Sequence, residues 1–366
     1  MKCVFTCGGT GGHLTPALAI ANTLRQNLSG VQILFVGTEG GMENEIVTAA
    51  DFSILPLRVK GFSGKNPFEM LRSFAMLRSA IGVAHDILEE FSPDIVIGTG
   101  SYACYPVCRA AISLGIPLAL HESNAVAGKA LRALSGKASR VWLNFEDTAK
   151  SLPSRARVLA VGNPISEAFY QKSQTCKREG MPHVLSFGGS LGASAINRAV
   201  LDMMALEAAR GGILHTHATG KREYDAFMAE FKRRGFDTVR NFTVVPFLSD
   251  MAQAMARAHV VVSRAGAMSI SEIAAAGRAC VLIPSPNVTG DHQTKNALVL
   301  AEKNAATLLP EGSLNGNSLY SLVSAYLLDE EKRKSTEKAV RAFYRGDTTS
   351  LIFEDVLQLV SQNKRK

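Results

Sequence analysis

Short apolar runs rich in β-branched residues alternate with longer segments of helical periodicity along almost the whole chain. This alternation predicts parallel sheets covered by helices, because successive parallel strands are joined by crossover helices. The expected fold class is therefore α/β. We expect strands near residues 2–6, 32–36, 53–57, 94–98, 117–120, 139–143 and 157–160 in the first half, and near 183–187, 213–217, 242–246, 259–263, 280–283 and 306–309 in the second.

The helical pattern is clearest between residues 69 and 90, where apolar residues recur at helical spacing and are expected to face the core. That stripe consists of Met70, Phe74, Leu77, Ile81, Ala84 and Leu88. In the second half, helices are expected near 193–208, 221–233, 249–257, 269–276 and 293–303. The tail, about 316–361, has the pattern of helix only, and its end, about 345–366, is expected to pack back on the first domain.

The chain is expected to form two similar domains. Its 366 residues exceed the size at which a single hydrophobic core stops growing. Gly162-Asn163-Pro164 interrupts the alternation, and residues 166–181 turn polar, which indicates a hinge. We place the two domains at 1–162 and 163–344.

Composition limits the class of protein further. The chain starts with strand-like sequence instead of a signal peptide, and no apolar run approaches the roughly 18 residues of a membrane span, so we expect a cytoplasmic protein. The net charge of +8 and the pI near 9.2 indicate an anionic partner, either a nucleotide, a phospholipid surface or a nucleic acid. The six cysteines lack Cys-x-x-Cys spacing and are expected to be small buried side chains.

Two glycine-rich turns, each between a strand and a helix, are the main candidates for phosphate binding. The first is residues 8–13 and the second is residues 188–192. Glycines let the backbone approach a ligand closely, and a helix N-terminus attracts anions. A dinucleotide site of the oxidoreductase type fits poorly, because Leu14 stands where its glycine pattern needs a small residue and because a second turn is left unexplained.

Three further candidates are polar residues that follow predicted strands. His13 ends the first turn at a helix start, where the helix dipole favours a neutral imidazole; it is either a general base or a residue that only caps the loop. Glu272 lies one turn inside a helix that begins near Ser269, which suits a diphosphate on the main-chain amides and ribose hydroxyls on the carboxylate. The cluster from His121 to Asn124 contacts a ligand, caps a helix through Ser123 or Asn124, or does both.

A metal site is not expected. Residues 291–296 contain Asp and His, but nothing nearby completes a ligand set, and the segment is better explained as a helix start with polar side chains aimed at a sugar. The chain also lacks an Asp-x-Asp pair of the kind that holds a divalent ion on a sugar nucleotide. No tightly bound cofactor is therefore expected.

The stretch from Arg58 to Arg78 is basic and partly apolar. Such a surface can rest on anionic lipid headgroups with its aromatic residues in the interface, or it is an ordinary solvated helix face. Nucleic acid is a less suitable partner, because the few aromatic residues do not alternate with the basic ones. The residues expected to contact the membrane are Phe62, Lys65, Phe68, Leu71 and Arg72.

Taken together, the motifs resemble those of glycosyltransferase family 28, and within it the bacterial transferases that add N-acetylglucosamine to a lipid-linked cell-wall precursor. They occur in the same order over nearly the whole chain. The motifs are Gly8-Gly9-Thr10-Gly11-Gly12-His13 with Pro16 and Ala17, His121-Glu122 with Asn124, Gly162-Asn163-Pro164, Gly188-Gly189-Ser190 with Gly192 and Ala193, and Ser269-Ile270-Ser271-Glu272 continuing to Gly277.

The resemblance implies a GT-B fold, with two Rossmann-like domains whose parallel sheets face each other across a cleft. Domain 1–162 would bind the acceptor and domain 163–344 the donor. The implied reaction is inverting transfer of N-acetylglucosamine from UDP-N-acetylglucosamine to the 4-hydroxyl of undecaprenyl-diphospho-N-acetylmuramoyl-pentapeptide (lipid I), which gives lipid II for peptidoglycan. Another GT-B transferase with a different nucleotide sugar or acceptor is the alternative, and a non-catalytic nucleotide-binding protein is a more distant one.

The resemblance also implies the residues of each site. His13 would be the catalytic base. The donor-binding residues would be Thr10, Gly11, Gly12, Asn124, Ser190, Leu248, Ala267, Met268, Ser269, Ile270, Ser271, Glu272, His292 and Gln293. The acceptor-binding residues would be Gly8, Gly9, His13, Tyr102 and Glu122.

Four positions depart from the family pattern. Ser166 stands where some members have a donor-binding arginine, so we assign no such contact. Ser101, Cys104 and Tyr105 stand where smaller residues are common, which affects the acceptor side. The implied partners are the donor, lipid I, an anionic membrane surface and other cell-wall synthesis and division proteins, with no nucleic acid. The implied location is peripheral, on the cytoplasmic face of the bacterial inner membrane.

Overall fold

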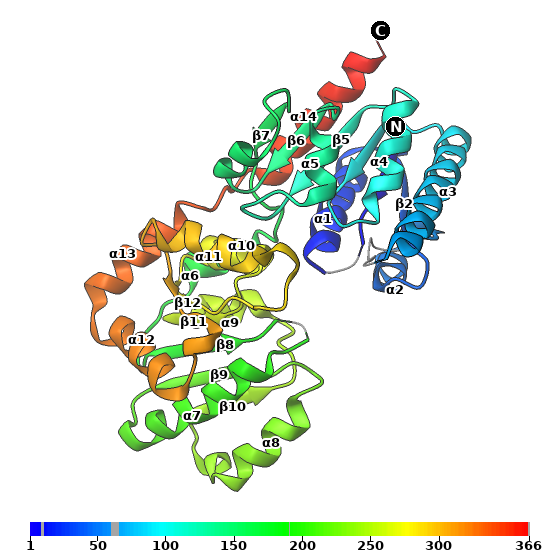
Figure 1. Ribbon diagram of the computed structural model, residues 1–366. Helices are drawn as coiled ribbons and strands as arrows, with labels where there is room; N and C mark the ends of the chain where they lie inside the picture. Colours follow the sequence, from blue (N-terminus) through cyan, green and yellow to red (C-terminus); the bar gives the residue numbers. More distant parts are fainter. Residues whose placement is uncertain (9–10, 60–65, 190, 365–366) are drawn as a thin grey trace. The chain divides into compact units, whose positions relative to one another are not determined.

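The structure is a computed structural model that describes residues 1–8, 11–59, 66–189 and 191–364 (Figure 1). It divides into two compact units. Unit 1 comprises Met1–Ile165 and Asp347–Lys366, and unit 2 comprises Ser166–Gly346. Each unit contains one parallel sheet with its own helices, so the predicted α/β class is confirmed.

The sheet of unit 1 has seven strands in the order β3-β2-β1-β4-β5-β6-β7. The strand order reverses beside β1, which pairs with β2 on one side and with β4 on the other. Ligands of such sheets gather at the carboxyl ends of the strands at this reversal point. The strands are β1 (Lys2–Thr6), β2 (Gln32–Thr38), β3 (Ser53–Leu57), β4 (Ile95–Gly98), β5 (Leu118–Glu122), β6 (Arg140–Leu143) and β7 (Val158–Ala160).

Helices cover both faces of this sheet (Figure 1). Alternate residues of a strand point to opposite faces, so Val4 belongs to one core and Phe5 to the other. Helices α3, α4 and α5 bury residues such as Leu88 in the first core, and α1 and α14 bury residues such as Ile20 and Val356 in the second. The helices are α1 (Gly11–Asn27), α2 (Met42–Ala49), α3 (Pro67–Phe91), α4 (Cys104–Ser113), α5 (Lys129–Ser135), the 3-10 helix η1 (Glu146–Ser151) and α14 (Thr348–Asn363).

The six-stranded sheet of unit 2 repeats this order as β10-β9-β8-β11-β12-β13. Its reversal point lies between β8 and β11, which pair directly. The strands are β8 (His183–Phe187), β9 (Leu214–Ala218), β10 (Phe242–Val245), β11 (Val260–Ser263), β12 (Ala279–Leu282) and β13 (Thr307–Leu308).

One core of unit 2 is formed by the sheet with α7, α8 and α12, for example through Met203, Phe231 and Leu319. Helices α6, α9 and α10 contact one another. The helices of unit 2 are α6 (Ala168–Thr175), α7 (Ser194–Arg210), α8 (Tyr224–Arg233), α9 (Met251–Arg257), α10 (Ala267–Ala276), α11 (His292–Ala301), α12 (Gly316–Leu328) and α13 (Glu330–Arg341), with the 3-10 helices η2 (Phe236–Thr238), η3 (Thr289–Asp291) and η4 (Glu311–Ser313).

The predicted strands are confirmed to within two residues at each end, and so is the helical tail. The last helix, α14, belongs to unit 1, where Asp355 accepts hydrogen bonds from Arg140 and from Trp142. Five of the six cysteines are buried, and Cys176 is partly exposed. Among the described residues, no helix is long and apolar enough to cross a membrane.

Candidate active site

His13 lies at the start of α1, in the turn that follows β1. Its Nδ1 atom is 3.0 Å from the carbonyl oxygen of Thr99, and the Thr99 hydroxyl donates to the carbonyl oxygen of His13 at 2.7 Å. Because a carbonyl oxygen can only accept, Nδ1 carries the proton in the neutral imidazole and Nε2 is the basic nitrogen. The ring is thus held in the tautomer that a base acting through Nε2 needs.

Gly100 leaves the space that the His13 ring occupies. A Cβ atom at Gly100 would lie 2.6 Å from Nδ1 of His13, and the φ of +109° at Gly100 favours glycine. The same turn places Tyr102, an expected acceptor contact, with 47% of its surface exposed. The turn after β4 therefore contacts the ring of the candidate base and also carries an exposed aromatic side chain.

The first glycine turn is only partly described. Gly8 is buried, and a Cβ there would lie 2.9 Å from that of Ala103 and 3.0 Å from Oε1 of Glu43. Gly11 and Gly12 are exposed at the start of α1, where main-chain N–H groups have no intrahelical acceptor. The other two expected contacts of this turn, Gly9 and Thr10, lie outside the described residues.

The cluster after β5 is organised by hydrogen bonds within unit 1. His121 is fully buried, and its Nε2 lies 3.1 Å from the carbonyl oxygen of Gly162, the glycine of the Gly-Asn-Pro motif. Burial lowers the pKa of His121 to about 4, so the neutral ring donates its Nε2–H to that carbonyl. His121 thereby fastens the end of β5 to the segment that leads out of unit 1.

The sequence had suggested Ser123 or Asn124 as a helix cap, but α5 has Gly128 as its N-cap residue and no side chain caps it; Glu122 holds this cluster together instead. One carboxylate oxygen of Glu122 accepts the backbone and side-chain N–H groups of Asn124 at 3.0 and 3.1 Å. The other accepts the N–H of Gly128, the residue before α5, at 3.0 Å. Glu122 therefore positions Asn124, and its contact with an acceptor stays a prediction.

In unit 2, α10 begins directly after the turn that follows β11. Its N-cap residue is Gly266, which has no side chain to cap the helix, so the N–H groups of Met268 and Ser269 face the turn. The positive end of the helix dipole lies at the same place. Of the other expected contacts, Ile270 is buried and the hydroxyl of Ser271 donates to the Ala267 carbonyl oxygen at 3.0 Å.

Glu272 lies one turn into α10 and is partly buried. Desolvation raises the pKa of Glu272 to about 7. No hydrogen bond to its carboxyl group is found in the part of the chain that the structure describes. A carboxyl group in this state gains most from a ligand that brings hydroxyl donors.

Two residues of α11 hold the neighbouring loops. Gln293 accepts the N–H of Ser285 through Oε1 at 2.9 Å, which leaves its Nε2 group as a donor. Asn296 is fully buried and donates to the carbonyl oxygen of Ala265, just before α10, at 3.2 Å. His292 is the first residue of α11 and is partly buried.

Arg264 is a site residue that the sequence left without a role. Its guanidinium donates to the carbonyl oxygens of Ile283 and Pro284, both at 3.2 Å, and forms an ion pair of 2.5 Å with Glu311. It joins the ends of β11 and β12 at the place where α10 begins. An arginine directly after a buried strand was the available signal.

The other expected donor contacts lie in loops of unit 2. Leu248 is partly buried after β10, next to the exposed Phe247. Gly192 and Gly220 pack so closely, both with positive φ, that neither has room for a side chain. Ser190 lies outside the described residues.

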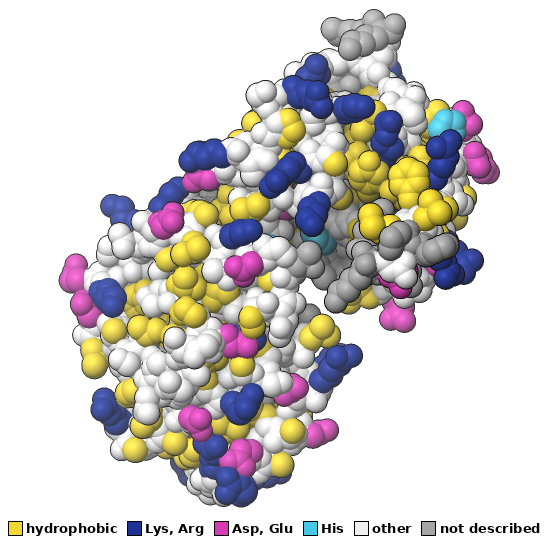
Figure 2. Space-filling model, viewed as in Figure 1, with side chains coloured by type: hydrophobic (Ala, Val, Ile, Leu, Met, Phe, Trp, Pro, Cys, Tyr) yellow, Lys and Arg dark blue, Asp and Glu magenta, His cyan; other side chains and the backbone are white. Residues whose placement is uncertain are grey.

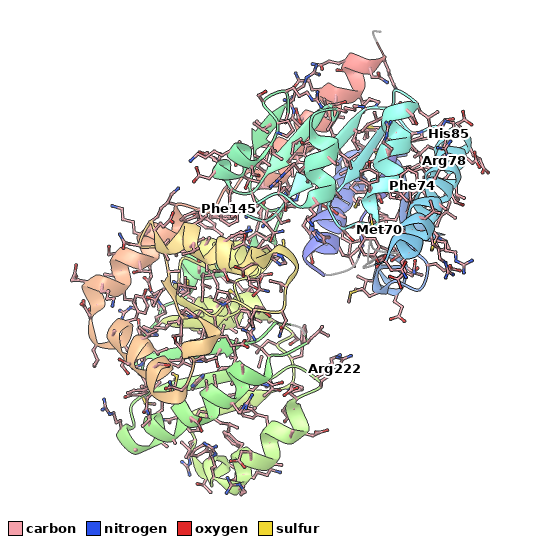
Figure 3. All side chains as sticks on the ribbon, in the orientation of Figure 1. Met70, Phe74, Arg78, His85, Phe145 and Arg222 are labelled. Carbon is pink, nitrogen blue, oxygen red and sulfur yellow. The ribbon has the colours of Figure 1, made fainter. Side chains whose placement is uncertain are left out.

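The start of α3 is exposed, which corrects part of the expected core stripe. Ala84 and Leu88 are buried as predicted, but Met70 and Phe74 expose 51% and 58% of their surface. Leu71, expected at a membrane, is 68% exposed, and Figure 2 shows hydrophobic side chains together with Lys and Arg over this part of unit 1. Met70, Phe74, Arg78 and His85 follow one another along the helix (Figure 3). Of the other expected membrane residues, Arg72 is exposed, Phe62 and Lys65 lie outside the described residues, and the Phe68 side chain is not described.

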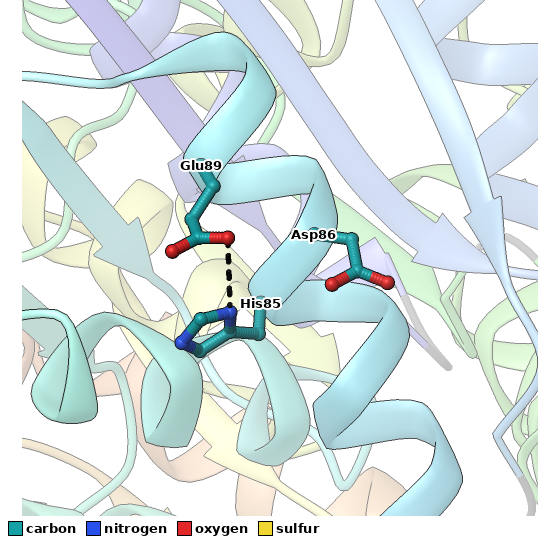
Figure 4. A group of neighbouring side chains, drawn as sticks. All are labelled: His85, Asp86 and Glu89. Carbon is teal, nitrogen blue, oxygen red and sulfur yellow. Dashed lines mark ion pairs between the residues drawn. The ribbon is translucent and has the colours of Figure 1, made fainter.

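Further along α3, His85, Asp86 and Glu89 are close enough to be considered as metal ligands (Figure 4). Asp86 and Glu89 are exposed, and Glu89 lies 3.6 Å from Nδ1 of His85. Residues four apart on a helix commonly form such pairs. This group is separate from the turns described above, and we assign it no metal.

The two parallel sheets with the strand order of Rossmann folds, each with a turn at its reversal point, define a protein of the GT-B fold class. A solved UDP-glucose:anthocyanidin 3-O-glucosyltransferase in complex with UDP shares this fold, with a TM-score of 0.70 at 15% identity over 99% of both chains. The chain belongs to glycosyltransferase family 28, whose N-terminal domain matches residues 3–143 and whose C-terminal domain matches residues 183–349. The predicted resemblance is therefore confirmed.

Relatives match along their whole length. The UDP-N-acetylglucosamine–N-acetylmuramyl-(pentapeptide) pyrophosphoryl-undecaprenol N-acetylglucosamine transferase of Lactobacillus helveticus is 37% identical, with 99% of this chain and 100% of the relative covered. The transferase of the same name from Acetivibrio thermocellus is 35% identical, with 100% and 99% covered. The crystal structure of MurG from Acinetobacter baumannii matches with a TM-score of 0.81 at 29% identity, over 98% of this chain and 99% of that one.

Proposed function

We propose that this chain transfers N-acetylglucosamine from UDP-N-acetylglucosamine to the 4-hydroxyl of lipid I and so forms lipid II. The observation that carries the proposal is the full-length similarity, at 35–37% identity, to transferases named for this donor and this acceptor. The local geometry agrees with it, because unit 2 has a helix start suited to a diphosphate and unit 1 has a histidine held as a base.

In this proposal unit 2 binds the donor. The N–H groups of Met268 and Ser269 and the dipole of α10 receive the diphosphate, as helix N-termini do for anions. Glu272 accepts hydrogen bonds from the ribose hydroxyls, and the Nε2 group of Gln293 donates to the sugar. Arg264 and Asn296 contact no ligand in this scheme but fix the loops that lead into α10 and follow β12.

Unit 1 supplies the base. Nε2 of His13 takes the proton of the acceptor 4-hydroxyl while that oxygen attacks C1 of the donor sugar. The bond between C1 and the diphosphate oxygen breaks, UDP leaves with the electron pair, and the configuration at C1 inverts from α to β. Negative charge develops on the departing diphosphate, where main-chain amides and a helix dipole stabilise it most. No step of this scheme requires a metal ion.

We also propose that unit 1 rests on the cytoplasmic face of the bacterial inner membrane through the start of α3. Met70, Leu71 and Phe74 are exposed there beside the basic residues Arg72 and Arg78. Apolar side chains within a basic surface suit an anionic bilayer. The lipid-linked acceptor would be met at this surface.

A radiolabel transfer assay with a lipid I analogue tests the proposed function. Label from UDP-N-acetylglucosamine should appear in the lipid product, and EDTA should leave the rate unchanged. Transfer only from other nucleotide sugars would indicate a different GT-B transferase. Binding of UDP without any transfer would indicate a non-catalytic nucleotide-binding protein.

A further inference from the structure

A chain of buried polar side chains runs under the second glycine turn. It starts at Glu207 near the end of α7 and passes through His215 of β9, Ser186 of β8 and His217 of β9 to Asn197 near the start of α7. The successive contacts are 2.7 Å from Glu207 to His215, 2.7 Å from His215 to Ser186, 2.7 Å from Ser186 to His217 and 3.1 Å from His217 to Asn197. All five residues are at most 4% exposed.

The hydrogen bonds of Asn197 determine which atoms donate and which accept along this chain of side chains. The amide nitrogen of Asn197 donates to the carbonyl oxygen of Thr219 at 3.0 Å, so its Oδ1 must accept a proton from Nε2 of His217. Burial lowers the pKa of His217 to about 3, so the ring is neutral. Its Nδ1 lies 2.7 Å from the Ser186 hydroxyl and 3.2 Å from the Ser186 carbonyl oxygen, and with the proton on Nε2 it accepts from the closer hydroxyl. Ser186 in turn accepts from Nε2 of His215, and one further proton is shared between His215 and Glu207.

Thr219 connects the chain to the glycine turn. A Cβ at Gly192 would overlap the Thr219 carbonyl oxygen, and Gly220 packs directly on the backbone of Gly192. The carbonyl that Asn197 holds is therefore the surface on which the turn rests. A shift of Thr219 would move the turn.

Unit 1 provides a comparison within the same molecule. Its sheet has the same strand order, and α1 follows β1 as α7 follows β8. The buried residues of α1 are all apolar: Leu14, Pro16, Ala17, Ile20, Ala21 and Leu24. Apolar packing thus suffices to hold such a helix. In unit 2 the corresponding helix α7 buries Asn197 and Glu207 against three polar residues of β8 and β9, which carries a desolvation penalty that packing alone does not explain.

We propose that the chain from Glu207 to Asn197 is a positioning device that sets the second glycine turn for the donor diphosphate, with His217 and Asn197 as its positioning residues. The proposal rests on the proposed function, in which the start of α10 receives the diphosphate of UDP-N-acetylglucosamine, and it adds the second glycine turn, which follows the neighbouring strand β8, to that site. Neither residue touches the donor. Each acts through the carbonyl of Thr219.

The test compares UDP affinity, measured by calorimetry, in three variants of the full chain. His217→Phe keeps the ring, which packs on Phe227 at a centroid distance of 4.8 Å, but loses both hydrogen bonds. It should weaken UDP binding about tenfold or more and raise the donor KM more than it lowers kcat. His217→Gln can donate from a nitrogen in the position of Nε2 and should restore most of the affinity.

The matched control is His183→Phe. His183 lies on β8, and its ring is 2.8 Å from the hydroxyl of Thr216 on β9, so it forms a hydrogen bond between the same two strands as Ser186 and His217 do. It lies on the opposite face of the sheet and at the other end of β8. This variant should lose stability without losing UDP affinity. Equal UDP affinity in wild type and folded His217→Phe overturns the proposal.

A measurement on the wild-type protein keeps the proposal testable if His217→Phe does not fold. Nitrogen-15 NMR of labelled histidines should find the His217 proton on Nε2 and should show this signal moving when UDP binds, while that of His183 stays. A proton on Nδ1, or an unchanged signal, overturns the proposal. Wild-type protein that binds no UDP would instead refute the proposed function.

Discussion

At the scale of single residues, the candidate base depends on a backbone carbonyl. The sequence indicated His13 from its place at a helix start, but Thr99 acts through its main chain, which no residue type reveals. Their 3.0 Å contact decides which imidazole nitrogen is basic. Gly100 could be predicted only as part of a glycine-containing turn, whereas its close approach to the ring explains why it must be glycine.

Replacement of His13 by alanine tests this role. We expect turnover to fall by about two orders of magnitude or more, the usual loss with a general base, while UDP affinity stays nearly unchanged. Initial rates and calorimetry measure the two effects. His85→Ala, a surface histidine on α3, is the control and should leave turnover intact. A rate for His13→Ala within a few-fold of wild type would remove His13 from the mechanism.

The raised pKa of Glu272 predicts a pH dependence of donor binding. Ribose hydroxyls donate to the ionised carboxylate, so binding competes with protonation of a group whose pKa is about 7 in the free protein. Affinity for UDP-N-acetylglucosamine should therefore be constant above about pH 8 and fall roughly tenfold per pH unit below 7. Calorimetry from pH 5.5 to 8.5 measures this.

The isosteric Glu272→Gln variant provides the control for this prediction. It should bind the donor more weakly at pH 8 and show no such slope, because its amide does not titrate in this range. A wild-type affinity that is flat across the range, or a slope that survives in Glu272→Gln, would contradict the assignment of Glu272 to the ribose.

At the scale of elements, hydrophobic periodicity predicted the positions of the helices in the sequence better than it predicted which of their residues are buried. The stripe of α3 has uniform helical spacing, yet only its last two members, Ala84 and Leu88, are buried. The helix has 25 residues and is about 38 Å long, whereas the five-residue strand β3 beside it spans roughly 17 Å. The start of α3 therefore extends beyond the sheet, and this mismatch cannot be read from either segment alone.

The exposed start of α3 predicts binding to anionic membranes. A variant with Leu71→Ser and Phe74→Ser should lose most of its flotation with liposomes that contain anionic lipid, because both side chains are largely exposed and have little role in the core. Activity on a water-soluble acceptor analogue should persist. The matched change Val83→Ser, at an exposed position nearer the end of the helix, should float normally. Flotation that is independent of anionic lipid, or equal in all variants, would contradict this role of α3.

The buried hydrogen-bonded side chains of unit 2 could not be predicted from the sequence, for a different reason. His215 and His217 alternate with Thr216, which resembles a strand with one polar, solvent-exposed face. In the structure α7 covers that face and supplies Asn197 and Glu207 as partners. Which helix covers a polar face is decided by tertiary packing, and strand periodicity contains no information about it.

At the scale of the whole molecule, one strand order is used twice for different tasks. In each unit the glycine turn follows the first strand of the sheet, at the reversal of strand order. The two turns were predicted from the sequence, but the buried polar groups beside them differ: Glu43, which accepts the N–H of Thr38, lies against Gly8 in unit 1, and the hydrogen-bonded chain that ends at Thr219 lies against Gly192 in unit 2.

This division of tasks predicts where UDP protects the protein from hydrogen exchange. At 100 times its dissociation constant, UDP should stabilise the unit that binds it by about 2.7 kcal/mol. Amides at the start of α10, such as Met268 and Ser269, and the strands of unit 2 should therefore exchange more slowly. Uridine, which lacks the diphosphate, should protect the start of α10 less. The sheet of unit 1 should exchange at its unliganded rate, because UDP alone brings no acceptor. Mass spectrometry of peptides from both sheets distinguishes the outcomes, and equal protection of β1 and β8 would contradict donor binding by unit 2 alone.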